Sequence, residues 1–273
     1  MYIGMRGHDF DTNTLDALCE KCKEYGVGGV QLVLLRSLAD FKKGNFTPEY
    51  AKSIGDKLRE NGIRVPILGC YINPSDANEE SLNESLDYFI ENLHYAKYIG
   101  AEMVGLETCR FSDDDEINNS EEFWYRIEVM YIEEEFVSAA EEIGVNVGIE
   151  GVHFHVINTP TKMKRLVDDL NSPNVRVIFD PVNYINTANY KNQDEIINTH
   201  FDLLGEKTKL LHLKDFKLVD GEVTYECPCD GLLNKDLLWD KLKQYNPDIA
   251  VILEEVKEDH LAQVKAAVEK RFV

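Results

Sequence analysis

The chain has 273 residues, of which 44% are hydrophobic and 29% are charged, so it can bury a substantial core. Acidic residues outnumber basic ones 50 to 29, and the net charge of -21 disfavours nucleic acid as the main partner, because phosphate backbones are bound by Lys and Arg. The sequence contains no run of about 18 apolar residues and no basic-then-apolar leader pattern. We therefore expect a cytoplasmic protein without nucleic-acid or membrane partners.

Short apolar segments alternate with helical patterns along the chain. Strands separated by whole helices cannot pair as hairpins, so the sheet should be parallel with right-handed crossovers. Eight such units in about 250 residues are typical of a closed barrel, and the alternative, a doubly wound open sheet, lacks its glycine-rich dinucleotide motif here. We expect an α/β protein whose residues 1–273 form a single (β/α)8 TIM barrel domain. The expected strands lie near 2–6, 29–34, 65–71, 103–107, 146–150, 175–180, 208–213 and 249–254.

Capping residues indicate where several helices should begin and end. Thr47 and Thr159 each precede a proline, which predicts an N-cap followed by proline at the first helical position. Ser81 and Glu84 have the spacing of a capping box. A long helical pattern covers residues 116–144. The glycines expected to end helices are Gly26, Gly62, Gly100 and Gly144.

Ionisable residues stand at the ends of four consecutive predicted strands. The carboxyl ends of all strands meet at one face of such a barrel, so these side chains should converge. Crowded carboxylates repel one another and resist burial, and a divalent cation removes both difficulties. Oxygen-rich ligation with one histidine favours Mn²⁺ or Mg²⁺, with Zn²⁺, Co²⁺ or Fe²⁺ as alternatives. The predicted ligands of one divalent metal are Glu150, Asp180, His212 and Glu254.

Each of these residues has a simpler interpretation when taken alone. A single acid at a strand end is more often a helix cap or a solvated loop residue, and a lone histidine is often part of a core. The metal interpretation rests on four such residues occurring in the order of neighbouring strands. Glu255 competes with Glu254, but side chains alternate along a strand, so only one of them can face inward. We assign Glu254 because it comes first after the apolar run.

These segments resemble the xylose-isomerase-like TIM barrel superfamily, in particular its group of sugar and sugar-phosphate isomerases and epimerases. The resemblance rests on GIEGV around Glu150, IFDPVN around Asp180, LHLKDF around His212 and VILEEV around Glu254. It implies that these four residues hold one metal ion. The chain departs from many relatives at Asn183, where they have a histidine, and no arginine follows the HLKD segment closely. The CPCDGLLN loop also lacks the two glycines that are common in relatives.

The resemblance implies a metal-dependent sugar isomerase or epimerase that moves a proton next to a carbonyl through an enediolate. Glu150 and Glu254 are the expected catalytic acid and base. Alternatives are an inosose-type dehydratase, an apurinic-site endonuclease, an aldolase with Lys214 as its Schiff-base lysine, and a barrel that binds sugar without turnover. The expected partner is a small sugar, and a homo-oligomer is compatible with the sequence. Residues expected to contact the substrate are Lys214, Asn183, Glu107, His8, Tyr71 and His153.

Overall fold

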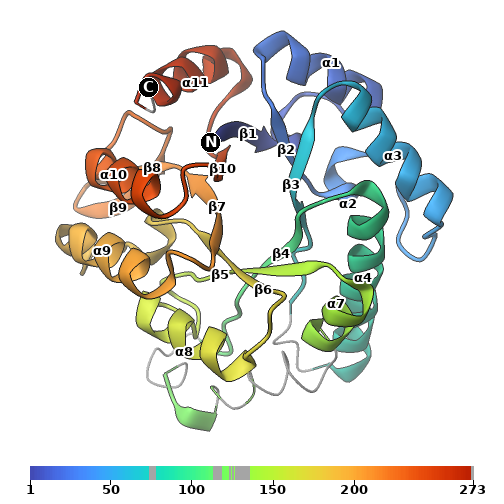
Figure 1. The fold of residues 1–273 in the computed structure, drawn as a ribbon. Coiled ribbons are helices and arrows are strands. Elements are labelled where there is room, and N and C mark those ends of the chain that lie inside the picture. The colour runs from blue at the N-terminus through green and yellow to red at the C-terminus, as the bar shows by residue number, and fades with distance from the viewer. Residues whose placement is uncertain (74–77, 113–118, 123, 125, 127–135, 272–273) are drawn as a thin grey trace.

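The centre of the molecule is a closed barrel of eight parallel strands (Figure 1), in the ring order β1-β10-β7-β6-β5-β4-β3-β2. The computed structural model describes residues 1–73, 78–112, 119–122, 124, 126 and 136–271. Each predicted barrel strand is confirmed, with ends that differ by at most two residues. The chain is therefore a single (β/α)8 barrel. The barrel strands are β1 (Tyr2–Arg6), β2 (Gly29–Leu32), β3 (Arg64–Gly69), β4 (Met103–Glu107), β5 (Asn146–Glu150), β6 (Val175–Phe179), β7 (Thr208–Leu213) and β10 (Ala250–Leu253).

Helices surround the barrel: α1 (Leu15–Tyr25), α2 (Leu34–Ser37), α3 (Pro48–Glu60), α4 (Glu79–Ile99), α7 (Phe136–Ile143), α8 (Pro160–Leu170), α9 (Gln193–Leu204), α10 (Lys235–Tyr245) and α11 (Leu261–Glu269). The Thr47 and Thr159 hydroxyls accept a hydrogen bond from the peptide N–H three residues later, and a proline follows each, as predicted. All four glycines predicted to end helices have positive φ angles, as at Gly26 (62°) and Gly100 (81°). Glycine adopts this conformation at least cost, so the helix ends are encoded locally.

The start of α4 differs from the prediction. The Asn78 side chain accepts a hydrogen bond from the Ser81 peptide N–H (3.0 Å) and is the N-cap, so the capping box at Ser81 is wrong. Asn caps helices as well as Ser does, and it comes one turn earlier. The helical pattern over 116–144 is confirmed at its end by α7. Its residues 116–118, 123, 125 and 127–135 lie outside the described residues.

An antiparallel hairpin that was not predicted lies between β7 and α10. It consists of β8 (Asp215–Val219) and β9 (Glu222–Glu226). Its two-residue turn, Asp220-Gly221, has positive φ at both positions, which an Asp-Gly pair adopts readily. The hairpin is therefore an insertion between the seventh barrel strand and the helix that follows it.

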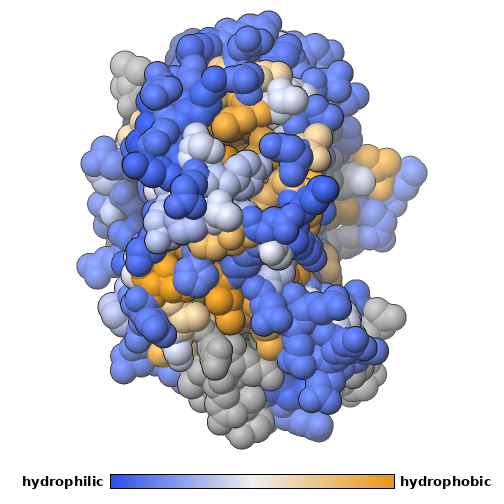
Figure 2. All heavy atoms as spheres, turned by 90° about the vertical axis from the view of Figure 1, so that its right-hand side faces the viewer, coloured by the Kyte–Doolittle hydropathy of each residue, from blue (hydrophilic) through white to orange (hydrophobic). Residues whose placement is uncertain are grey.

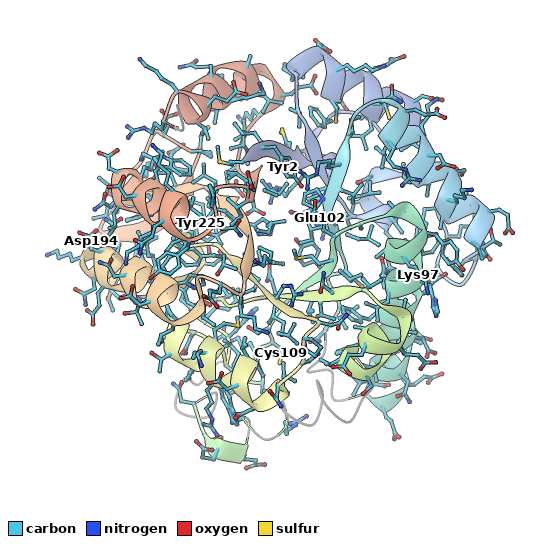
Figure 3. All side chains as sticks on the ribbon, viewed as in Figure 1. Tyr2, Lys97, Glu102, Cys109, Asp194 and Tyr225 are labelled. Atoms are coloured by element: carbon cyan, nitrogen blue, oxygen red, sulfur yellow. The ribbon has the colours of Figure 1, made fainter. Side chains whose placement is uncertain are left out.

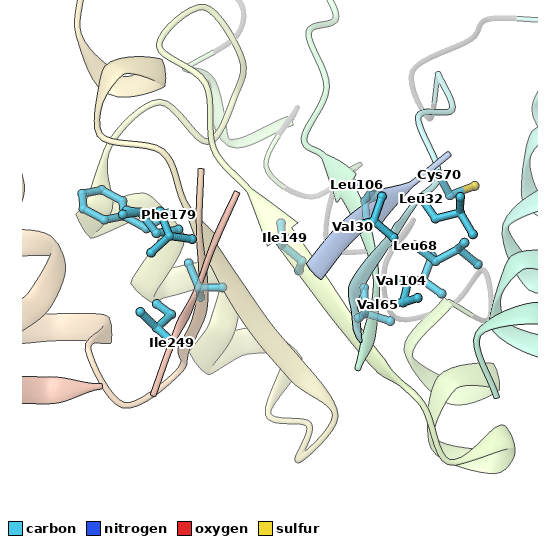
Figure 4. Close-up of a cluster of buried hydrophobic side chains, with 14 of the residues drawn as sticks. Val30, Leu32, Val65, Leu68, Cys70, Val104, Leu106, Ile149, Phe179 and Ile249 are labelled. Carbon is cyan, nitrogen blue, oxygen red and sulfur yellow. The ribbon is translucent and has the colours of Figure 1, made fainter. Parts of the chain in front are cut away.

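Apolar side chains fill two regions, one between strands and helices (Figure 4) and one inside the barrel. On β4, Val104 and Leu106 belong to the outer region and Met103 to the inner one, because side chains alternate along a strand. A Cβ atom on Gly105 would lie 2.2 Å from Ile67 Cδ1, so glycine here makes room for branched neighbours. The inner layer consists of Ile67, Met103, Ile178, Leu210, Ala250 and Ile252.

A polar group closes the amino-terminal end of the barrel. The Tyr2 hydroxyl donates a hydrogen bond to Glu102 (3.1 Å), and Figure 3 shows both residues near the centre of the view. Arg64 pairs with Glu102 at 2.6 Å, and its guanidinium carbon lies 4.0 Å from the centroid of the Tyr2 ring. With the apolar layer above it, this group makes the barrel a filled core without a pore.

The side of the molecule that carries α3 and α4 is mainly hydrophilic, with smaller apolar areas between the charged groups (Figure 2). This distribution agrees with the excess of acidic residues in the sequence. None of the described helices combines the length and apolarity that a membrane span requires.

Candidate active site

Four polar side chains stand directly above the inner apolar layer. Glu150 ends β5, Asp180 follows β6, His212 lies in β7 and Glu254 follows β10. All four are buried, with at most 6% of their surface exposed. Each comes two residues after an inward-facing position, so strand alternation turns it into the barrel. The inward positions beneath them are Gly148, Ile178, Leu210 and Ile252.

Three of the predicted ligands form a compact donor set. The nearest oxygen or nitrogen atoms of Glu150, Asp180 and His212 all lie within 4.8 Å of one another. Neither ring nitrogen of His212 makes a well-aligned hydrogen bond with the residues that the structure describes. Glu254 is outside this set of three, although its Oε1 lies 3.5 Å from His212 Nδ1. Two carboxylates and an imidazole with unused donor atoms fit a divalent cation.

Asn183 and Lys214 connect the residues of this donor set through hydrogen bonds and an ion pair. Asp180 Oδ1 accepts hydrogen bonds from the peptide N–H groups of Val182 (2.9 Å) and Asn183 (3.2 Å). The Asn183 amide donates to Glu150 Oε1 at 2.8 Å, and its oxygen accepts from Lys214 Nζ at 2.7 Å. Asp180 Oδ2 lies 2.7 Å from the same ammonium. The local turn after β6 thus fixes the direction of the Asp180 carboxylate.

The ionisation of these groups reflects their burial and crowding. Burial raises the pKa of Asp180 to about 6, and Lys214 limits that rise. Burial and the charge of Glu150 raise the pKa of Glu107 to about 7. Burial opposes protonation of His212, but the neighbouring carboxylates, Glu150 first, raise its pKa to about 9. The site therefore attracts protons and cations, as expected for acids held together in a low dielectric.

A cavity of about 400 Å³ opens above these groups. Asp180 and His212 lie below it and do not line it. His153 does not line it either: its peptide N–H donates to the Asn183 carbonyl at 2.6 Å, and the next residue, Phe154, reaches the cavity instead. The other predicted residues come together at the cavity wall: His8, Tyr71, Glu107, Glu150, Asn183, Lys214 and Glu254.

Several lining residues were missed by sequence reasoning. Arg6 comes two positions after the inward-facing Gly4 on β1, so the alternation rule could have found it. It pairs with Asp9 at 2.7 Å. Phe154 lies in a loop, Arg36 in the short helix α2 and Tyr225 in β9 of the hairpin that was not predicted, so the expected barrel strands gave no direction for these side chains. Val152 was also missed. The expectation that only one of Glu254 and Glu255 faces inward is wrong: Glu255 also lines the cavity, because its backbone beyond the end of β10 has a φ of 55° and no longer alternates as a strand does.

Residues 19–271 match the model of the family described as Xylose isomerase-like TIM barrel. The chain belongs to this family. The superfamily expected from the strand-end motifs is thereby confirmed, and the match covers nearly the whole barrel. Among curated protein sequences, none is significantly similar to this family member.

Solved structures of similar barrels share its fold at low identity. The IolI protein with a bound zinc atom has a TM-score of 0.73 and 17% identity, over 100% of this chain and 98% of that chain. The 3-keto-D-glucoside 4-epimerase YcjR from E. coli has a TM-score of 0.74 and 18% identity, over 99% of both chains. AsbF from Bacillus anthracis, assigned as a probable 3-DHS dehydratase, has a TM-score of 0.74 and 12% identity, over 98% of this chain and 99% of that chain. At such identities the likeness establishes the fold of this xylose isomerase-like barrel alone.

In this family member, neighbouring residues of the HLKD segment point in opposite directions. Lys214 lines the cavity, whereas Asp215 is fully buried away from it. The Asp215 carboxylate accepts three peptide N–H groups at 2.9 to 3.0 Å and the Lys235 ammonium at 2.5 Å. It therefore fastens the loop before α10 to the start of the hairpin. The peptide donors are those of Phe216, Gly231 and Leu233.

Replacing Asp215 with Ala should lower the free energy of unfolding by about 3 to 5 kcal/mol, because it leaves a partly buried ammonium and three peptide N–H groups without their acceptor. Urea denaturation measures this loss. The exposed Asp230 lies in the same loop, and Asp230→Asn should change stability by no more than about 0.5 kcal/mol. An Asp215→Ala protein as stable as the wild type would contradict the anchoring role.

Proposed function

We propose that this barrel is a metal-dependent sugar isomerase or epimerase that works by proton transfer next to a carbonyl. The observation that carries the proposal is the placement of two glutamates around one atom. Glu150 Oε2 lies 3.0 Å and Glu254 Oε1 3.5 Å from His212 Nδ1, and both glutamates line the cavity. A substrate carbon above this point would be within reach of two carboxylates, which is what removal and return of a proton require.

A divalent metal is part of the proposal. Glu150, Asp180 and His212 would hold it, with Glu254 beside them, because these donors are buried, close together and partly unused. Carboxylate-rich ligation favours Mn²⁺ or Mg²⁺, and the zinc in the IolI structure keeps Zn²⁺ among the candidates. When bound, such an ion supplies Lewis-acid polarisation of a carbonyl oxygen.

The side chains of the chain would carry the proton chemistry. One of Glu150 and Glu254, as a carboxylate, removes the proton next to the carbonyl, which leaves an enediolate. The other, protonated beforehand, returns its proton, and exchange with solvent restores both carboxyls. Return to the opposite face of the same carbon gives an epimer. Delivery to the adjacent carbon, together with movement of the hydroxyl proton to the former carbonyl oxygen, gives an isomer. Glu107, whose pKa is about 7, adds a third carboxyl that exchanges protons near neutral pH.

The remaining cavity residues would bind the substrate. The Lys214 ammonium and the Asn183 amide face the cavity between the two glutamates and can hold a hydroxyl or carbonyl oxygen. His8 and Tyr71 lie on the wall formed by the first and third barrel strands. The Tyr71 hydroxyl accepts a hydrogen bond from Gln31 at 2.5 Å, which fixes its direction. We assign His153 no contact with the substrate, because its peptide N–H holds the Asn183 carbonyl and its side chain does not line the cavity.

Dehydration of an inosose-type ketone is the second candidate function. It begins with the same proton loss, and a barrel assigned as a dehydratase shares the fold. An aldolase is disfavoured: although burial opposes its charge, Asp180 and Glu254 raise the pKa of Lys214, whereas a Schiff-base lysine needs a lowered one. An endonuclease is disfavoured by the acidic sequence and by finding a single metal-like donor set among the described residues.

Turnover of a panel of ketoses, keto-glycosides and inososes tests the function. The protein would be stripped with a chelator and assayed again after addition of Mn²⁺, Mg²⁺ or Zn²⁺. We expect epimer or isomer formation that disappears on stripping and returns with metal. Loss of water from an inosose would identify the dehydratase. Sugar binding without turnover under all conditions would leave only a binding protein.

A further inference from the structure

The Lys214 ammonium lies where a cation would be expected in the donor set. It is 2.7 Å from Asp180 Oδ2 and 3.4 Å from Glu254 Oε2, and the residue is only 4% exposed. We propose that Lys214 is a built-in competitor of the divalent cation, which neutralises the ligand carboxylates in the metal-free protein and thereby sets the metal affinity. This inference rests on the proposed metal site.

The charge balance supports this role. Glu150, Asp180 and Glu254 bring three buried carboxylates to one end of the barrel. Arg6 lies 3.8 Å from Glu254 and is engaged by Asp9 at 2.7 Å, and His212 faces Glu150 at 3.0 Å. Lys214 is the ammonium in contact with Asp180, and together with His212 it offsets these carboxylates before a metal arrives, since buried like charges are costly without a counter-charge.

Asp180 has one oxygen to share between the two cations. Its Oδ1 accepts two peptide N–H groups, so Oδ2 is the oxygen left for a metal, and Oδ2 already faces Lys214. A divalent ion that binds here must share this oxygen with the ammonium or displace the ammonium. Because two positive charges a few Å apart repel strongly in a buried site, the ammonium opposes metal binding.

The ammonium also has partners other than the carboxylates. Lys214 Nζ contacts the Asn183 side-chain oxygen at 2.7 Å and lies 4.6 Å from the centroid of the Tyr225 ring. Both partners line the cavity, so the ammonium would keep them if a divalent ion displaced it from Asp180.

The test compares Lys214→Met with Lys235→Met. Lys235 is the matched control, because it also pairs with a buried carboxylate, Asp215, at 2.5 Å, but lies outside the cavity. Each metal-free protein is titrated with Mn²⁺, and free Mn²⁺ is counted by electron paramagnetic resonance. The midpoint of thermal unfolding is measured without metal and at saturating Mn²⁺. Lys214→Gln serves as a second neutral variant.

We expect Lys214→Met to bind Mn²⁺ about tenfold more tightly than the wild type, or more, because the competing charge is gone. Its metal-free form should unfold at a lower temperature, and the rise on adding Mn²⁺ should be larger than in the wild type. Lys235→Met should lose stability with and without Mn²⁺ and keep the wild-type affinity.

Unchanged or weaker Mn²⁺ binding by a folded Lys214→Met protein would overturn the inference and leave the metal site intact. Failure of both neutral variants to fold at saturating Mn²⁺ would overturn it as well, since the divalent ion should replace the ammonium. A wild-type protein that binds no Mn²⁺, Mg²⁺ or Zn²⁺ would instead remove the proposed metal site itself.

Discussion

Glu150→Gln and Glu254→Gln should each lower turnover by about 10² to 10⁴, the usual contribution of a general acid or base. Glutamine keeps an oxygen that the Asn183 amide or the Lys214 ammonium can still reach, but it cannot accept a proton. The rate constant at saturating substrate measures the loss. In D₂O, the wild-type product should carry deuterium at the reacting carbon, because carboxyl protons exchange with solvent.

Metal content must be measured in the same samples, since either substitution also removes a charged group near the metal. Glu102→Gln is a suitable control, because Glu102 lies at the opposite end of the barrel beside Tyr2. Its activity should stay close to that of the wild type. Near-normal activity of a metal-replete Glu150→Gln or Glu254→Gln protein, together with unlabelled product, would overturn the assigned roles while leaving the metal site standing.

Asp180→Asn and His212→Gln should each empty the metal site. The asparagine introduced in the first variant would still accept the two peptide N–H groups through its oxygen, so the turn after β6 is kept while the ligand charge is lost. His212→Gln removes the imidazole at the centre of the donor set. Elemental analysis of proteins purified from metal-supplemented cultures should show about one divalent ion per wild-type chain and little in either variant.

Glu107→Gln is the matched control for this loss. Glu107 lines the same cavity, and its Cα pairs with that of Glu150 across β4 and β5, but it is not among the three clustered donors. Its variant should therefore keep the metal. Full occupancy in both Asp180→Asn and His212→Gln would show that the ion, if any, is held elsewhere.

The fold was predictable because its signals are local. Apolar runs, threonine-proline starts and glycine stops each constrain a few residues, and parallel strands separated by helices leave few arrangements. The hairpin shows where this reasoning ends. Its Asp220-Gly221 turn is a strong hairpin signal, but the expectation of a helix after every barrel strand took precedence.

The strand-end residues of the candidate site were also predictable, because alternation along a strand decides which side chains face inward. Glu254 is buried, whereas the side chain of Glu255 is 45% exposed and also lines the cavity, because the backbone beyond β10 has a φ of 55° at Glu255 and strand alternation ends there. Side chains in loops follow no such period. His153 was therefore expected at the cavity where Phe154 lies, and Tyr225 could not be placed without the hairpin. The partners of Asp215 depend on a loop contact that sequence spacing does not reveal.

The packed interior of the barrel also determines how molecules enter and leave the cavity. Ile67, Ile178 and their neighbours fill the barrel beneath the cavity, and Tyr2 closes its far end, so the cavity is a blind pocket. Whatever enters the cavity therefore has to leave through the same opening. One molecule can therefore enter only after the previous one has left, and a molecule that leaves slowly keeps the next one out.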